Sequence, residues 1–137
     1  MSQPSICFVA PNAYPVLAGS HDLPIIGGAE LQQVIVAKEL ARRGHQVSMI
    51  CLDFGQEDGT EIEGVTVFRA FRPDRGWPVV RFLSPRLTSI WACLARANSD
   101  VYYQRTAGML TGIVARFCLR HGKKSVFAAA GNPDFFR

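Results

Sequence analysis

The apolar positions of this 137-residue chain follow two alternating periods along the sequence. Short runs of apolar residues predict strands, most of them buried on both faces of a sheet. Apolar residues at helical spacing predict amphipathic helices between those strands. The predicted strands are residues 6–10, 46–52, 65–70, 100–104 and 125–130. The predicted helices are residues 29–43, a segment that begins at Pro85 and includes Ala95, and residues 107–121.

The predicted helices have clear ends and clear apolar faces. Gly44 and Gly122 are typical helix stops, and Ser84 followed by Pro85 is a typical start. Thr106 is a second candidate cap, and we expect the hydrophilic residues 53–62 to form a surface connection. The apolar faces are expected to be Val34, Val36, Ala37, Leu40 and Ala41; then Leu87, Ile90, Trp91, Leu94 and Ala95; then Leu110, Ile113, Val114, Phe117 and Cys118.

Strands that alternate with helices predict a Rossmann-like α/β fold, a three-layer sandwich with a mostly parallel sheet covered on both faces. We expect residues 1–137 to form one such domain. Ligands of these folds bind at the carboxyl ends of the strands, so the loops at that edge are the segments to search for a site. Because the sequence ends soon after its last predicted strand, we expect an incomplete domain.

The first of these loops carries a glycine pair at the start of a helix. Seventeen residues, Pro11 to Gly27, separate the first predicted strand from Gly28, the second glycine of the pair. Glu30 follows two residues later. A dinucleotide fingerprint has its glycines directly after the strand, so NAD binding is disfavoured. Free amides at a helix N-terminus favour a phosphate, and glycine lets it approach. The alternative is a tight turn with no ligand.

Charge divides the chain into two unequal halves. Residues 1–68 hold three basic and eight acidic side chains, and residues 69–137 hold twelve basic and three acidic ones. This asymmetry suits an anionic partner: lipid headgroups, phosphates or nucleic acid. No nucleic-acid-binding motif is visible, so nucleic acid is not expected. The four cysteines and three histidines are scattered, which predicts no metal site.

Two other loops hold candidate binding residues. Gln104 and Arg105 follow a predicted strand, and an arginine there can bind phosphate or carboxylate. Helix capping or a surface role is the alternative. His21 and Asp22 lie in the long first loop and are candidates for a sugar-hydroxyl or acid–base contact, against a solvated loop.

The stretch from IIGGAELQQ to ARRGHQVSMI, at residues 25–50, resembles the first helix and second strand of the family-4 glycosyltransferases, which have the two-domain GT-B fold. The later DVYYQRTAGMLTGIVARFCLRHGKKSVF, at residues 100–127, is similar to the strand and helix that follow in some bacterial members. The resemblance extends over essentially the whole chain, and the stretch from Gly-Gly-Ala-Glu to Arg-Arg-Gly-His is its most specific part.

This resemblance implies a hexosyltransferase-like enzyme that moves a sugar from a nucleotide-sugar to an acceptor with retention. The chain would be the amino-terminal, acceptor-side domain, with the Gly-Gly loop near the donor diphosphate and no metal or other cofactor required. The donor-binding domain is absent from this sequence, so the chain is expected to be inactive alone. A non-catalytic α/β binding module is the alternative.

One departure concerns the residues after the last predicted strand. Many family members carry a histidine there, whereas this chain has Asn132 and Asp134, which are candidate polar contacts or turn residues. No catalytic residue is assigned.

The segment 69–86 combines arginines with aromatic and aliphatic residues. The segment holds five arginines and a single acidic residue, Asp74, and this excess of positive charge suits peripheral contact with an anionic membrane. The arginines are Arg69, Arg72, Arg75, Arg81 and Arg86. The alternative is a mobile loop over the acceptor cleft. With no transmembrane run and no signal peptide in the sequence, we expect a cytoplasmic protein, peripheral at the inner membrane face, that can pair as a homodimer.

Overall fold

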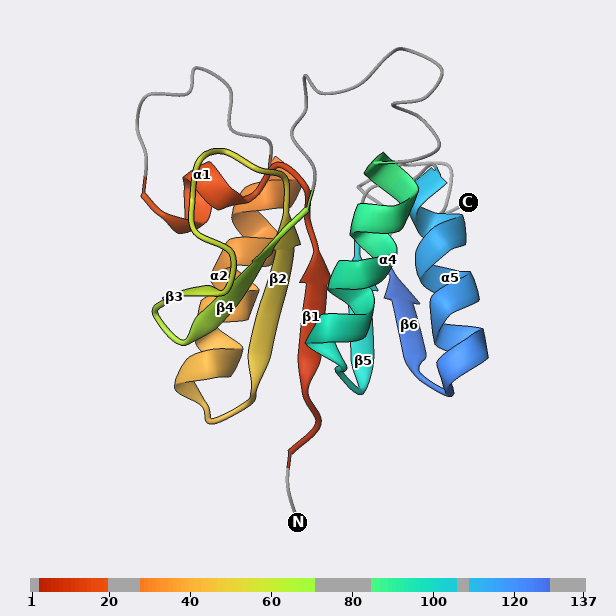
Figure 1. Cartoon of the computed structure of the whole chain (residues 1–137). Helices are drawn as coiled ribbons and strands as arrows, with labels where there is room; N and C mark the ends of the chain where they lie inside the picture. The colour runs from red at the N-terminus through yellow and green to blue at the C-terminus, as the bar shows by residue number, and fades with distance from the viewer. Residues whose placement is uncertain (1–2, 20–27, 71–84, 106–108, 129–137) are drawn as a thin grey trace, which may run out of the picture.

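The computed structural model describes residues 3–19, 28–70, 85–105 and 109–128. Helices and strands alternate along these ranges (Figure 1). In chain order they are β1 (Ile6–Val9), α1 (Tyr14–Leu17), α2 (Gly28–Arg42), β2 (Val47–Cys51), β3 (Thr60–Ile62), β4 (Val65–Arg69), α4 (Pro85–Ala97), β5 (Val101–Gln104), α5 (Met109–His121) and β6 (Lys124–Phe127).

The strands form one six-stranded sheet in the order β3-β4-β2-β1-β5-β6. All neighbours pair in parallel except β3, which runs antiparallel to β4. The central strand β1 pairs with β2 on one side and with β5 on the other. This sheet with helices on both faces confirms the predicted Rossmann-like α/β fold and its mostly parallel sheet.

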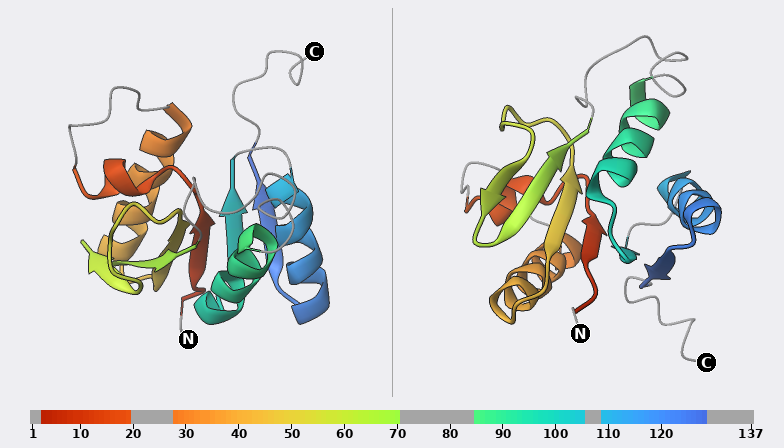
Figure 2. Two further views of the ribbon diagram at one scale, coloured as in Figure 1. Left: turned by 45° about the horizontal axis from the view of Figure 1, so that its top comes forward. Right: turned by 60° about the horizontal axis from the view of Figure 1, so that its bottom comes forward.

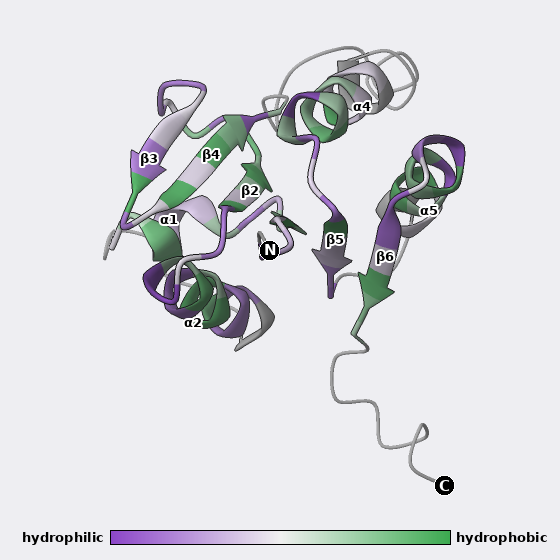
Figure 3. Cartoon of the chain, turned by 90° about the horizontal axis from the view of Figure 1, so that it is seen from below, coloured by the Kyte–Doolittle hydropathy of each residue, from purple (hydrophilic) through white to green (hydrophobic). Residues whose placement is uncertain are grey.

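The helices lie in two layers. Figures 2 and 3 show α1 and α2 on one face of the sheet, with α4 and α5 on the other. Helix α2 packs over β2 and β4, whereas α4 packs over β2 and β4 from the opposite side and α5 over β5 and β6. The buried side chains of the central strands therefore enter one of two cores.

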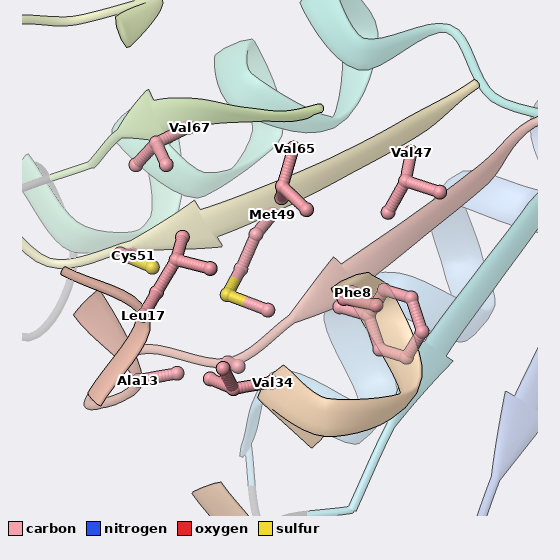
Figure 4. Close-up of a cluster of buried hydrophobic side chains, with 11 residues drawn as sticks. Phe8, Ala13, Leu17, Val34, Val47, Met49, Cys51, Val65 and Val67 are labelled. Carbon is pink, nitrogen blue, oxygen red and sulfur yellow. The ribbon is translucent and has the colours of Figure 1, made fainter. Parts of the chain in front are cut away.

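The core beneath α1 and α2 is built from alternate strand residues. Phe8 of β1 and Met49 of β2 are buried there beside Leu17 of α1 and Val34 of α2 (Figure 4). The alternation arises because neighbouring residues of a strand point to opposite faces.

The core beneath α4 and α5 contains the strand side chains that point to the opposite face of the sheet. Cys7 and Tyr102 from the strands meet Leu94 of α4 and Phe117 of α5. The buried Tyr102 hydroxyl donates to the Leu94 carbonyl at 2.6 Å and accepts from the Ser99 amide at 3.0 Å. These bonds satisfy the polar end of a large apolar side chain and tie β5 to the end of α4.

Both predicted glycine stops are confirmed. Gly44 has φ 96° and follows α2, and the amide of His45 bonds back to the Leu40 carbonyl at 3.1 Å. Gly122 has φ 66° after α5, where Lys123 bonds back to Cys118 at 2.8 Å. This left-handed ending satisfies the last helical carbonyls.

Several expected details are wrong at the level of single residues. Residues 60–62 form β3 rather than part of a surface connection, and part of the long first loop forms α1. In α2, Val36 is exposed and Gln33 is buried in its place. In α4, Ala95 is exposed and Cys93 is buried. Helical spacing defines a broad stripe, and the exact position of the neighbouring sheet decides which edge of the stripe is covered.

The last strand departs from the expectation of a sheet covered on both faces. It starts at Lys124, and all four of its side chains are exposed. Strand β6 lies at the edge of the sheet, so one neighbouring strand and α5 are its main contacts.

The four cysteines are free and buried, so we expect them to be unreactive in the native chain. Burial raises the pKa of Cys7 to about 12 and that of Cys93 to about 11, and it also raises the pKa of Cys51 and Cys118. At mildly alkaline pH a chromogenic disulfide reagent should modify four thiols only after denaturation. Rapid modification of a thiol in the folded chain would contradict this packing.

The close contact between the β3–β4 turn and α2 can be tested by substitution of Gly64. It has φ 84°, and a Cβ there would lie 3.0 Å from the Ala41 Cβ. Gly59 has φ 86°, and a Cβ there would meet nothing within 4 Å, so it serves as the matched control. We expect Gly59→Ala to lower the free energy of unfolding by about 1 kcal/mol and Gly64→Ala by about 2 kcal/mol or more. Urea titration measures both, and equal losses would show that the turn does not press on the helix.

Candidate functional site

The carboxyl ends of the five parallel strands gather at one edge of the sheet, at the top of Figure 1. Strands β1, β2, β4, β5 and β6 end at this edge, and helices α2, α4 and α5 begin beside it. Ligands of Rossmann-like folds bind along this edge because the loops there are free of sheet hydrogen bonds. We therefore take it as the candidate substrate site.

The junction after β1 is fixed to its neighbours by backbone hydrogen bonds. The amide of Ala10 donates to the Ile50 carbonyl at 3.0 Å, and the amide of Leu52 donates to the Pro11 carbonyl at 2.9 Å. Helix α1 follows, with Pro15 at its start and with Leu17 buried against α2. This first connection is therefore partly helical and anchored at its base.

Helix α2 begins at Gly28, which lies at the carboxyl edge of the sheet (Figure 1). The first amides of a helix have no partner within the helix, and the helix dipole makes this end positive. Glu30 lies in the first turn, where a carboxylate complements that dipole. Gly27 lies outside the described residues, so the structure places only the second glycine of the pair.

The loop after β2 is a compact polar unit that sequence reasoning treated only as a connection. Buried Gln56 accepts from the Phe54 amide at 2.7 Å and donates to the Leu52 carbonyl at 2.8 Å. Asp53 accepts from the Gly55 amide at 2.9 Å. Local side-chain bonds of this kind hold a turn in one conformation. The run Asp-Phe-Gly-Gln at residues 53–56 is the part of the sequence from which this turn could have been predicted.

Asp58 joins this loop to β4 and α4. Its carboxylate accepts from the Arg69 amide at 2.8 Å and pairs with the Arg96 guanidinium. Partial burial raises the pKa of Asp58, but these two hydrogen bonds outweigh it and hold the pKa below its ordinary value of 3.8. The Arg69 guanidinium donates to the Gln56 carbonyl at 3.1 Å, so Arg69 is engaged within the fold.

Two aromatic rings meet at the same edge. Tyr14 of α1 and Phe54 of the β2–β3 loop stack with their centroids 6.4 Å apart and an interplanar angle of 13°. Phe54 remains 39% exposed. An exposed ring face can pack against the apolar face of a ligand. Sequence reasoning did not single out this pair, because its members come from different connections.

At the end of β5, Gln104 and Arg105 have different surroundings. Gln104 is 2% exposed, and its amide nitrogen donates to Thr111 Oγ1 of α5 at 2.7 Å. This bond ties β5 to α5. Arg105 is half-buried, and among the described residues its buried Nε has no hydrogen-bond partner. The substrate contact expected for this pair stays a prediction, and the geometry favours Arg105 over Gln104 for it.

The remaining expected site residues lie outside the described ranges. They are His21, Asn132 and Asp134, with Gly27 named above. The segment expected at a membrane, 69–86, is described only at its two ends, residues 69–70 and 85–86. Within the described residues, no three histidine, cysteine or acidic side chains are grouped to hold a metal ion. No helix in those ranges combines the length and the apolarity that crossing a membrane requires.

The element order and the sheet described above define a Rossmann-like α/β domain. A model of the family described as Glycosyltransferase Family 4 matches residues 26–129, which is most of the chain. The chain therefore belongs to this glycosyltransferase family, as the sequence resemblance predicted. No curated protein and no solved structure matches it.

The Asp58–Arg96 pair yields a pH prediction. Because the folded-state pKa of Asp58 is lowered, its stabilisation is present above 3.8 and is lost as the pH falls through the lower folded value. We expect Asp58→Asn to lower the free energy of unfolding by about 1 kcal/mol at neutral pH. The gap between variant and wild type should close in acid.

Urea denaturation at a series of pH values measures this gap. In the Asp58→Asn background, Arg96→Gln should cost less than it does in the wild type, because its partner is already gone. A gap that stays constant down to strongly acidic pH would contradict the assigned pairing.

Proposed function

We propose that this chain is the acceptor-side domain of a glycosyltransferase that moves a sugar from a nucleotide-sugar to an acceptor. The observation that carries the proposal is the family match over residues 26–129, which includes the start of α2 at the carboxyl edge of the sheet. In the proposed reaction the bond between the anomeric carbon and the donor diphosphate breaks. A bond to an acceptor oxygen forms, the acceptor hydroxyl loses its proton, and a nucleoside diphosphate leaves.

The amides at the start of α2 are the proposed contact with the donor diphosphate. Negative charge develops on the leaving diphosphate, and a positive helix end stabilises that charge without a metal ion. Gly28 carries no side chain, so a phosphate oxygen can approach its backbone. Metal independence and retention at the anomeric carbon are parts of the proposal that follow the family resemblance.

Arg105 is the proposed acceptor contact at the end of β5. A guanidinium can bind a carboxylate or phosphate through two parallel hydrogen bonds. The Gln104–Thr111 hydrogen bond holds the end of β5 against α5, which fixes the point from which Arg105 extends. Phe54, partly exposed at the same edge, supplies an apolar face for a sugar ring.

A second domain is needed for the donor nucleotide, so the isolated chain is expected to be inactive. We expect the chain alone to give no transfer from any nucleotide-sugar, measured by release of nucleoside diphosphate. Transfer by the chain alone would show that the donor site lies within these 137 residues.

The diphosphate contact is testable on the chain itself by nuclear magnetic resonance. Titration with inorganic pyrophosphate should shift the amide signals of residues 28–30 more than those elsewhere. Gly28→Val should weaken the response about tenfold, because the side chain blocks the approach to the amides. Gly112→Val is the matched control, since a Cβ at Gly112 meets nothing within 4 Å and lies far along the chain in α5.

Two outcomes would count against the proposal. If the signals of residues 28–30 do not move, the phosphate role of α2 is wrong. If pyrophosphate binds equally well to Gly28→Val and Gly112→Val, it binds elsewhere. A chain that binds pyrophosphate there but shows no transfer when joined to a donor domain would favour the non-catalytic binding module.

A further inference from the structure

Helix α5 presents its most exposed apolar side chain beside two exposed arginines. Leu119 is 86% exposed, more than any other large apolar residue of the described chain. Arg116 precedes it by three residues and Arg120 follows it directly, and both are exposed. Residues three or four apart in a helix are neighbours on its surface, so these three side chains form one continuous face. Lys123 and Lys124 follow the end of the helix, and we name these five residues the α5 patch.

The inner side of α5 is occupied and does not compete for this face. Val114, Phe117 and Cys118 are buried against the sheet and α4. His121 contacts this inner side through its ring, 4.4 Å from that of Phe117 and 6.2 Å from that of Trp91, although the residue is exposed. The large exposed side chains of the second half of α5 are therefore Arg116, Leu119, Arg120 and His121.

In the folded chain, most of the described acidic residues lie on the β3 side of the sheet, whereas α5 lies on the β6 side. The described acidic residues are confined, with one exception, to α2, β3 and the loops beside β2 and β4. They are Glu30, Glu39, Asp53, Glu57, Asp58, Glu61 and Glu63, and the exception is Asp100. Because β3 and β6 are the two edge strands of the sheet (Figures 1 and 3), most of the described acidic residues and the α5 patch lie toward opposite edges.

Most of the α5 patch has no acidic partner among the described residues. The ion pairs of the described chain use Lys38, Arg42, Arg43, Arg69 and Arg96. Within the same residues, Arg116, Arg120 and Lys124 form no ion pair. Lys123 donates to the side chain of Asn98 at 3.0 Å and interacts electrostatically with Asp100. The charges of Arg116, Arg120 and Lys124 are therefore available to an external anion.

We propose that the α5 patch is a docking surface for an anionic lipid bilayer. Clustered arginine and lysine side chains are attracted to acidic headgroups, and an exposed leucine among them can enter the boundary between headgroups and acyl chains. A polyanion such as nucleic acid binds through its phosphate charges and does not account for an exposed leucine beside the arginines. The opposite charge of the β3 edge turns that side of the molecule away from the membrane.

This surface differs from the segment 69–86 that the sequence suggested for a membrane. Arg69 of that segment is bound to the loop around Gln56 and Asp58. The α5 patch lies on the outer face of the helix next to β6, and it does not depend on the proposed transfer reaction.

The test is flotation of the whole chain with vesicles. We expect binding to vesicles of phosphatidylglycerol and phosphatidylcholine in equal amounts, and none to vesicles of phosphatidylcholine alone. Arg116→Gln and Arg120→Gln should each lower the partition coefficient about fivefold. Leu119→Gln should lower it about tenfold with the charges unchanged.

Matched controls lie on α2. Arg42→Gln removes an exposed arginine from the acidic side, and Ile35→Gln removes an apolar side chain that is 58% exposed. Both should leave vesicle binding unchanged. Far-ultraviolet circular dichroism and thermal melting of every variant confirm that each is folded, which is expected for exposed positions.

Three results would overturn the proposal. The first is the absence of binding to the anionic vesicles. The second is equal loss for the α5 variants and the α2 controls. The third is binding to heparin or duplex DNA that depends on Arg116 and Arg120, while vesicle binding is indifferent to Leu119; that result would assign the patch to a soluble polyanion.

Discussion

The double burial of β1 is the constraint on which the rest of this structure depends. A strand covered on both faces must place its backbone polar groups in ladders with neighbours on each side, here β2 and β5, and must receive helices above and below. Phe8 enters one core and Cys7 the other. Because the parallel neighbours are connected by helices, their carboxyl ends meet at one edge. The candidate site is therefore a consequence of how the central strand is buried.

The same arrangement separates the functions that the chain is proposed to perform. The start of α2, the loop around Gln56 and the end of β5 lie at the carboxyl edge, where hydrogen bonds such as that from Gln104 to Thr111 hold the loops in place. The α5 patch lies on the outer face of the last described helix, on the basic side of the sheet. A domain oriented by its charge separation could bring its carboxyl edge to an acceptor near a membrane surface.

Sequence reasoning identified the fold because hydrophobic period, helix stops and strand–helix alternation agreed with one another. The Gly44 and Gly122 endings followed from the residue type alone, since few other residues adopt a left-handed backbone without strain. Strand β3 was missed although the Glu63–Gly64 pair, with φ of 49° and 84°, makes a two-residue hairpin turn. A three-residue edge strand has too few positions to show a period. Gly28 and Arg105 lie at the expected edge of the sheet and the amide of Gln104 bonds to a neighbouring helix, while the binding roles expected for these residues stay predictions.

What the sequence determined by itself was the alternation of elements, the family and the imbalance of charge between the two halves, because each depends on local pattern or composition. The tertiary structure alone decided that Gln33 and Cys93 are buried while Val36 and Ala95 are not, since burial depends on which neighbour covers each edge of a helix. It also decided that Asp58 joins Arg69 and Arg96, which lie on separate elements. Finally, it turned a charge imbalance along the chain into two opposite sides of the molecule, because the strand order puts β3 and β6 at opposite edges.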